Sequence, residues 1–241
     1  MFVKKNNFRA VIFELDGVIV NSVEAGLSNI ETVCVINDIP FTVKERDAIL
    51  KLWSNPTEVI LTEGLGLELD RASLLLKQLK LLEEHRPAPL VNCVNNTMIW
   101  LRRNKIAKGL LSSRNRYPLS QLLTEKDLLE EFVEGGIAAL EDTKHPKPDP
   151  KAFDKNLSDL ARRGIDREEC IYVGNTQIDI DAGTSAGITT LIALTGPMEL
   201  TDIPASCLPI QNFLESIAKL PEWIERHHEG ELLNPDLPSL I

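Results

Sequence analysis

Short apolar runs recur along the chain, separated by longer segments whose apolar residues follow helical spacing. Such runs are typical of strands that are buried on both faces of a parallel sheet. We expect five of them, at Arg9–Leu15, Ile106–Ser112, Cys170–Gly174, Thr189–Leu194 and, more briefly, Leu208–Ile210. Because the runs alternate with helical segments, the pattern predicts an α/β fold with a doubly wound, mostly parallel sheet.

A helical insert is expected between the first two strands. Residues from about 21 to 86 contain few β-branched runs and carry leucines at helical spacing, as in Ala72–Leu82. We therefore divide the chain into an α/β core, residues 1–20 and 88–241, and a small helical domain, residues 21–87. In the core, helices are expected around Thr97–Arg103, Leu119–Glu131, Pro150–Arg163, Asp179–Ala186 and up to about Arg226, with an extended piece near Phe132–Ala139.

Polar residues gather where three of the predicted strands end. Glu14 and Asp16 lie two positions apart, so their side chains point to the same side of the first strand. Ser112 and Ser113 end the second strand, and Gly174–Thr176 ends the third. Ligands of open parallel sheets bind outside the carboxyl ends of the strands, and crowded carboxylates favour a divalent cation. The pattern predicts a metal site at this edge of the sheet.

Four motifs carry a resemblance to a known family. Val11–Ser22 resembles the first motif of the haloacid dehalogenase-like (HAD) superfamily, and Ser112 matches the Ser/Thr of its second motif. Lys147–Phe153 is similar to the lysine motif, and Tyr172–Gly183 to the fourth motif. The resemblance spans about residues 9–215 and implies the Rossmann-like HAD fold, with the helical insert standing where the family has its C1 cap. Within the family, the chain resembles the phosphoglycolate phosphatase and β-phosphoglucomutase branch.

The resemblance implies a role for each matched position. Glu14 stands at the position of the nucleophile that attacks phosphorus, and Asp16 at that of the acid that protonates the leaving oxygen. Ser112 and Lys147 would hold the phosphoryl oxygens. The implied set is catalytic Glu14, Asp16, Ser112 and Lys147; phosphate-binding Ser112, Ser113, Lys147 and Gly17; and, for Mg²⁺, Glu14, Asp16 through its backbone carbonyl, Asn175 and Asp179.

Two positions depart from the family pattern, which has aspartate where Glu14 and Asn175 stand. Glu14 adds a methylene and so moves the carboxylate by roughly 1.5 Å, and a misplacement near 1 Å can cost about a hundredfold in rate. Asn175 keeps an oxygen but loses a charge. We therefore expect weak Mg²⁺ binding and slow or absent phosphatase turnover.

Some assignments stay open at this stage. Ser113 stands beside Ser112 and could take its role, and Lys144 and His145 are close to Lys147. Asp179 is also placed where a helix N-terminus favours an acid.

Three functions follow from these residues. The leading hypothesis is a Mg²⁺-dependent phosphatase of a small phosphorylated metabolite with attenuated activity. The second is a catalytically inactive HAD fold that binds a ligand or a protein partner, which the changes at Glu14 and Asn175 favour. The third is a haloacid dehalogenase, against which the retained Asp16 argues.

The composition limits the classes of partner that the protein is expected to bind. The 241 residues carry a net charge of −10, which argues against nucleic acid and anionic membranes as partners. Four widely spaced cysteines suggest free thiols in a reducing compartment. No leader or apolar run of membrane-spanning length is visible, so we expect a cytoplasmic location. We expect a monomer or a homodimer.

Overall fold

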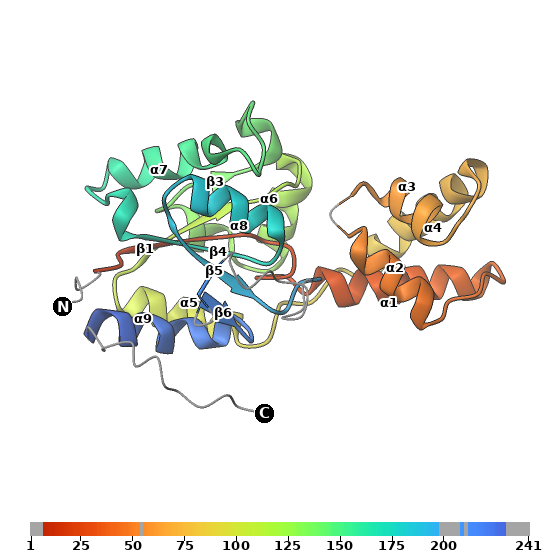
Figure 1. Cartoon of the computed structure of the whole chain (residues 1–241), viewed down its shortest axis with the longest axis horizontal. Coiled ribbons are helices and arrows are strands. Elements are labelled where there is room, and N and C mark those ends of the chain that lie inside the picture. The colour runs from red at the N-terminus through yellow and green to blue at the C-terminus, as the bar shows by residue number, and fades with distance from the viewer. Residues whose placement is uncertain (1–6, 54, 198–207, 210–211, 230–241) are drawn as a thin grey trace.

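The computed structural model describes residues 7–53, 55–197, 208–209 and 212–229. Its centre is a six-stranded sheet (Figure 1). The strands are β1 (Ala10–Phe13), β2 (Ala107–Leu111), β3 (Ile137–Ala138), β4 (Cys170–Gly174), β5 (Thr189–Ala193) and β6 (Phe213–Leu214). Every pair of neighbours is parallel, so the predicted α/β class with a parallel sheet is confirmed.

The strand order is β3-β2-β1-β4-β5-β6. The chain first builds the sheet outward from β1 through β2 and β3, and then crosses back to place β4 on the other side of β1. The order therefore reverses between β1 and β4, and ligands of such sheets bind at this point, outside the carboxyl ends of the strands.

Helices cover both faces of the sheet. One face packs against α5 (Val94–Arg103) and α9 (Leu220–Glu229), and the other against α7 (Asp154–Ala161) and α8 (Gln177–Ser185) (Figure 1). Successive residues of β1 alternate between the two hydrophobic clusters, as the pleat of a strand requires. Because both faces are buried, all four residues of β1 are apolar, which explains the continuous run in the sequence.

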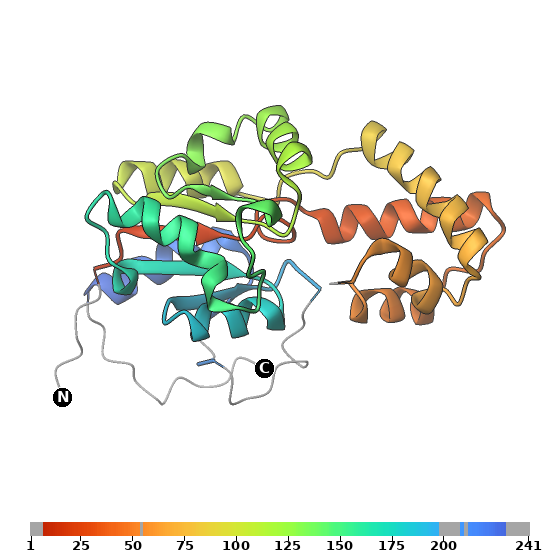
Figure 2. The ribbon, with the colours of Figure 1, turned by 90° about the horizontal axis from the view of Figure 1, so that it is seen from above.

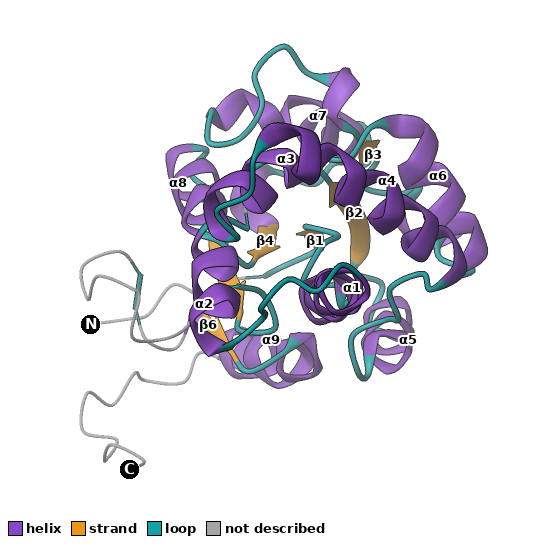
Figure 3. Ribbon diagram, turned by 90° about the vertical axis from the view of Figure 1, so that its right-hand side faces the viewer, coloured by secondary structure: helices purple, strands orange, loops and turns teal. Residues whose placement is uncertain are grey.

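A separate group of helices follows β1. It contains α1 (Ser22–Ile36), α2 (Val43–Lys51), α3 (Thr57–Val59), a π-helical turn (Ile60–Gly64) and α4 (Leu69–His85). We call residues 22–85 the helical unit. It has its own hydrophobic cluster and stands beyond the carboxyl ends of the strands, to the right of the sheet in Figure 2 and nearest the viewer in Figure 3.

The two connections between the helical unit and the sheet run side by side. Val20 forms isolated bridges with Asp16 and with Leu90, and the Asn21 N–H donates to the Pro89 carbonyl at 2.8 Å. These bonds anchor both ends of the unit at the rim of β1. None of the described helices is both long and apolar enough to cross a bilayer.

Some predicted elements differ from the structure. The helix expected at Pro150–Arg163 is a 3₁₀ turn (Pro150–Phe153) followed by α7. The helix expected at Leu119–Glu131 is α6 (Arg116–Glu125) followed by a 3₁₀ turn (Leu129–Phe132), because Asp127 takes a positive φ of 55°, which an α-helix cannot continue. The extended piece near Phe132–Ala139 shortens to β3.

The predicted strand at Leu208–Ile210 is wrong in its described part. Leu208 and Pro209 are not in a strand, and Ile210 lies outside the described residues. The edge strand is β6, three residues further along. It pairs with β5 through Phe213 and Leu214, and proline cannot donate to such a ladder.

Candidate active site

The predicted site residues converge at the switch point between β1 and β4. A cavity of about 320 Å³ opens there between the sheet and the helical unit. Glu14, Asp16, Ser113, Lys147, Asn175 and Asp179 line it from the core side. Trp53, Asn55, Thr57, Ile60, Leu79 and Glu83 are among the residues that line it from the helical unit.

Glu14 directly continues β1. Its N–H donates to the Val173 carbonyl at 2.9 Å, which fixes the backbone against β4. The side chain is 7% exposed and bends back, so that Oε1 accepts from the N–H groups of Leu15 and Asp16 at 2.8 and 3.4 Å. Oε2 pairs with the Lys147 ammonium. Burial raises the pKa of Glu14 to about 7, although Lys147 opposes the rise.

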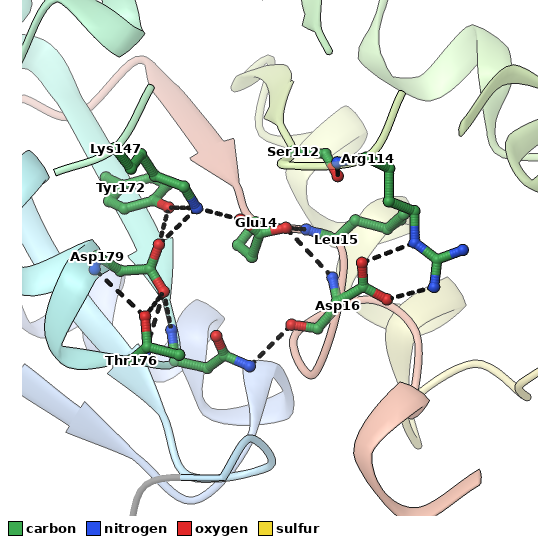
Figure 4. Close-up of polar contacts among 10 residues, drawn as sticks. Glu14, Leu15, Asp16, Ser112, Arg114, Lys147, Tyr172, Thr176 and Asp179 are labelled. Atoms are coloured by element: carbon green, nitrogen blue, oxygen red, sulfur yellow. Dashed lines mark hydrogen bonds and ion pairs between the residues drawn. The ribbon is translucent and has the colours of Figure 1, made fainter. Parts of the chain in front are cut away.

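Lys147 joins Glu14 to Asp179 (Figure 4). Its side chain is 6% exposed, and Nζ donates to Asp179 Oδ1 at 2.6 Å and to the Tyr172 hydroxyl at 3.1 Å. Burial favours a lower pKa for Lys147, but Asp179 and Glu14 outweigh it and raise the pKa well above its usual value. Lys147 is thus a fixed cation at the centre of a buried cluster. Lys144 and His145 are exposed and do not line this cavity.

Asp179 serves two purposes. It is the third residue of α8 and forms a capping box with Thr176, whose N–H and hydroxyl donate to Asp179 Oδ2 at 3.0 and 2.7 Å. Oδ1 faces Lys147 and also accepts from the Tyr172 hydroxyl at 2.6 Å. Burial favours a raised pKa for Asp179, but Lys147 outweighs burial and lowers it. The helix N-terminus therefore holds the carboxylate that anchors Lys147.

Asp16 has a partner that the sequence did not indicate. Arg114 donates from Nε to Asp16 Oδ2 and from Nη2 to Asp16 Oδ1, both at 2.7 Å (Figure 4). Such a two-pronged pair fixes the orientation of the carboxylate. Burial favours a lower pKa for Arg114, but the hydrogen bonds and charge of Asp16 raise it. Both oxygens of the predicted acid are therefore occupied.

The predicted phosphate-binding residues divide into two groups. Ser113 and Lys147 face the cavity. Ser112 is 3% exposed, and its Oγ accepts from the Arg114 N–H at 3.2 Å. Gly17 has a φ of +75° and donates its N–H to the Val20 carbonyl at 2.7 Å. In this arrangement Gly17 makes the turn after β1, and Ser113 is the hydroxyl that reaches the cavity.

Most oxygens of the predicted Mg²⁺ ligands already accept hydrogen bonds, and Asn175 Oδ1 is the exception among them. The Asp16 carbonyl accepts from Asn175 Nδ2 at 2.7 Å, and both oxygens of Glu14 and of Asp179 accept from N–H, ammonium or hydroxyl donors. Across the described residues, no three His, Cys, Asp or Glu side chains are arranged to hold a metal ion. Because Mg²⁺ needs near-octahedral oxygen ligands, the side chains as arranged do not fit it.

Sequence reasoning missed three residues that complete the cluster. Thr176 and Asp179 form a Thr-x-x-Asp pattern, which is a readable capping signal. Tyr172 stands in an otherwise apolar run, and a buried tyrosine hydroxyl needs a partner. Arg114 lies two residues beyond Ser112, just after the end of β2, but nothing in the sequence distinguishes it from Arg116.

Known proteins share both the sequence pattern and the fold. The profile of the haloacid dehalogenase-like hydrolases matches residues 11–193. Phosphoglycolate phosphatase 1 of Pseudomonas aeruginosa is 26% identical over 192 residues, which cover 75% of this chain and 67% of that protein. Phosphoglycolate phosphatase of Synechococcus elongatus is 27% identical over 209 residues, 83% of this chain and 90% of that protein. The crystal structure of a predicted phosphoglycolate phosphatase from Haemophilus somnus has a TM-score of 0.68 at 17% identity, with 91% of this chain and 99% of that one covered.

Proposed function

Because this chain belongs to the haloacid dehalogenase-like hydrolases, we propose that it is a phosphatase that slowly hydrolyses a small phosphorylated metabolite. One observation carries the proposal: Glu14, Asp16, Lys147 and Asp179 come from distant parts of the chain and line one cavity. Both relatives described above are phosphatases, which supports a phosphate ester over a carbon–halogen bond as the substrate.

The proposed reaction has two steps. In the first, a Glu14 oxygen forms a bond to phosphorus while the ester P–O bond breaks, and Asp16 gives its proton to the leaving oxygen. In the second, Asp16 takes a proton from water, which attacks the phosphorus and releases phosphate and the free Glu14 carboxylate. Lys147 lies beside Glu14 and offsets the negative charge on the phosphoryl oxygens. The family implies Mg²⁺, which the sequence predicts to bind weakly, and neither step uses it.

Slow turnover has a structural basis in this proposal. Both oxygens of Glu14 are held by donors, so one must be released before it can attack. Both oxygens of Asp16 are held by Arg114, so one must also be freed to carry a proton. A hydrogen bond to a charged group is worth about 1.5–3 kcal/mol, so each release adds to the barrier.

The helical unit is proposed to act as the cap that selects the leaving group. Among its described residues that line the cavity, Glu83 is the sole charged side chain, beside the apolar Trp53 and Ile60. A leaving group that carries a second negative charge would be repelled by Glu83, because no cation from the described part of the unit lines the cavity. The cations near Glu83 are Lys80, which does not line the cavity, and Arg114, which is paired with Asp16. This supports a leaving group that is neutral or cationic and has an apolar face.

Replacing Glu83 by glutamine is expected to raise kcat/KM for phosphoglycolate, relative to phenyl phosphate, by roughly fivefold, because an exposed like charge at the cavity contributes about 1 kcal/mol of repulsion. The two substrates differ in the carboxylate of the leaving group. Glu84→Gln is the matched control, since the neighbouring carboxylate does not line this cavity. An unchanged ratio in Glu83→Gln would contradict the role given to Glu83.

Hydrolysis of phenyl phosphate by the purified full chain tests the proposed function. We expect release of inorganic phosphate at a rate that Glu14→Gln reduces to background, since the amide keeps the shape of the side chain but cannot attack. A wild-type rate equal to that of Glu14→Gln, together with no turnover across a panel of phosphorylated metabolites, would overturn the proposal.

For an aryl phosphate whose leaving group is acidic enough to depart without the Asp16 proton, kcat/KM is expected to rise with pH and to level off above about 7, because Glu14 must be ionised to attack and burial raises its pKa to about 7. One pH unit below that midpoint, kcat/KM should be about tenfold lower. The measurement uses two aryl phosphates whose own second pKa values differ. A midpoint that follows the substrate instead of the enzyme would contradict this assignment.

A reducing compartment is also part of the proposal. Cys34 and Cys170 are buried free thiols, and Cys93 is an exposed one, while Cys207 lies outside the described residues. Free thiols suit the cytoplasmic location that the sequence predicts.

A further inference from the structure

The Asn175 side chain lies where the ends of β1 and β4 meet. It is 4% exposed, and Nδ2 donates to the Asp16 carbonyl at 2.7 Å. Its own N–H donates to Asp179 Oδ2 at 3.0 Å. One residue thus links the loop after β1 to the start of α8. The carbonyl that the family resemblance assigns to a metal already has an amide donor.

Two glycines hold the Asn175 amide in place. A Cβ added to Gly17 would lie 2.0 Å from Asn175 Nδ2, and one added to Gly196 would lie 2.4 Å from the same atom. Both distances are too short for any side chain, so the amide fills the space that the glycines leave. The Thr195 hydroxyl also donates to the Gly17 carbonyl at 2.6 Å. The loops after β1, β4 and β5 are therefore packed together around this amide.

Each acidic side chain around the amide already forms an ion pair with a cation of the chain. Lys147 pairs with Glu14 and Asp179, and Arg114 pairs with Asp16. Lys147 is almost completely buried, so its charge is only weakly screened by water. To reach the same oxygens, a divalent ion would have to break the hydrogen bond of Asn175 and approach against the positive charge of Lys147. Mg²⁺ also gives up its own water ligands reluctantly.

We propose that this chain binds phosphate without a divalent cation: the Asn175 amide replaces the metal as the link between the ends of β1 and β4, and Lys147 supplies the positive charge. The inference rests on the proposed function, because it takes phosphate to be the ligand of the cavity. It goes beyond that function in stating that the site needs no metal. A carboxylate at position 175 would repel the Asp16 carbonyl unless a cation stood between them, whereas an amide bonds to it directly.

Isothermal titration with inorganic phosphate tests the proposal without any turnover. The purified full chain is titrated once in EDTA and once in millimolar Mg²⁺, and Mg²⁺ alone is titrated into the chain. We expect the same phosphate Kd, within about twofold, in both buffers, and no heat of binding from Mg²⁺ alone. Phosphate binding that tightens tenfold or more with Mg²⁺ would overturn this inference and leave the proposed function intact. No phosphate binding in either buffer would overturn this inference, and the phenyl phosphate assay would then test the proposed function separately.

Asn175→Asp provides a second measurement. It restores a carboxylate beside the Asp16 carbonyl, so we expect a chain whose Tm is lower than that of the wild type in EDTA and rises on addition of Mg²⁺. The wild type and Asn95→Asp, which adds the same charge at an exposed position of α5, should show no Mg²⁺-dependent rise. A wild-type Tm that rises with Mg²⁺ as much as that of Asn175→Asp would overturn the proposal. If Asn175→Asp does not fold, the phosphate and Mg²⁺ titrations of the wild type still test the proposal.

Discussion

Replacing Lys147 by methionine is expected to destabilise the fold by about 3–5 kcal/mol and to abolish turnover. Methionine keeps most of the volume but leaves Glu14 and Asp179 buried without their shared cation, and breaking a buried ion pair on one side costs about that much. For a chain of this size, the loss lowers Tm by on the order of 10 °C. Thermal and urea unfolding give the measurement, and Lys144→Met is the exposed control.

The pH dependence of this loss identifies its cause. A carboxyl whose pKa is higher in the folded chain than in the unfolded one binds its proton more tightly when folded, so its contribution to stability falls as pH rises between the two values. For Glu14 that window runs from 4.5 to about 7 in the wild type. Without Lys147 the pKa of Glu14 in the folded chain is higher, because the charge of Lys147 lowers it in the wild type. The loss in free energy of unfolding that Lys147→Met causes should therefore be smaller at pH 5 than at pH 8. An equal loss at both pH values would indicate lost packing instead.

Glu14→Asp is expected to raise kcat by about ten- to a hundredfold. The glutamate bends back so that Oε1 accepts from the Leu15 N–H, and the carboxylate is thereby held by donors on both sides. The shorter aspartate cannot bend in this way, and a shift of about 1 Å toward the attacking position is worth up to about a hundredfold. Steady-state kinetics on phenyl phosphate give the measurement.

Two comparisons make the Glu14→Asp result specific. Asp179→Glu changes a neighbouring carboxylate by the same methylene in the opposite direction and should lower kcat, since Asp179 is held by Lys147, Tyr172 and Thr176 at once. Equal or lower kcat in Glu14→Asp would mean that the length of the side chain is not what limits turnover. The account of slow turnover would then rest on the Arg114 pair with Asp16 alone.

The position of the site was predictable from local patterns. A strand buried on both faces must be a short apolar run, and a glycine or an acidic cluster ends it, so Glu14 and Asp16 could be placed at a strand end from sequence alone. The same holds for Asn175, which directly follows Gly174 at the end of β4. Parallel strands bring such ends to one edge of the sheet, and the structure confirms the sheet that does so.

The weakly patterned parts of the chain were predicted less well. The edge strand β6 has two residues, and so short a segment has no periodicity to recognise. The end of α6 depends on a positive φ at Asp127, a conformation that Asp tolerates without requiring it. At β6 and at the end of α6, the conformational preference of the local sequence is small, so tertiary contacts determine the structure.

The sequence by itself determined the order of the strands along the chain, the location of the helical segment, and which acids stand at the strand ends. These features depend on residues that are neighbours in the chain. Only the tertiary structure decided how the charges are paired. Lys147 meets Glu14 across 133 positions, Arg114 meets Asp16 across 98, and Asn175 reaches the Asp16 carbonyl across 159. A long side chain has many rotamers with similar energies, and its partner is selected by the burial and the loop packing that the complete fold creates.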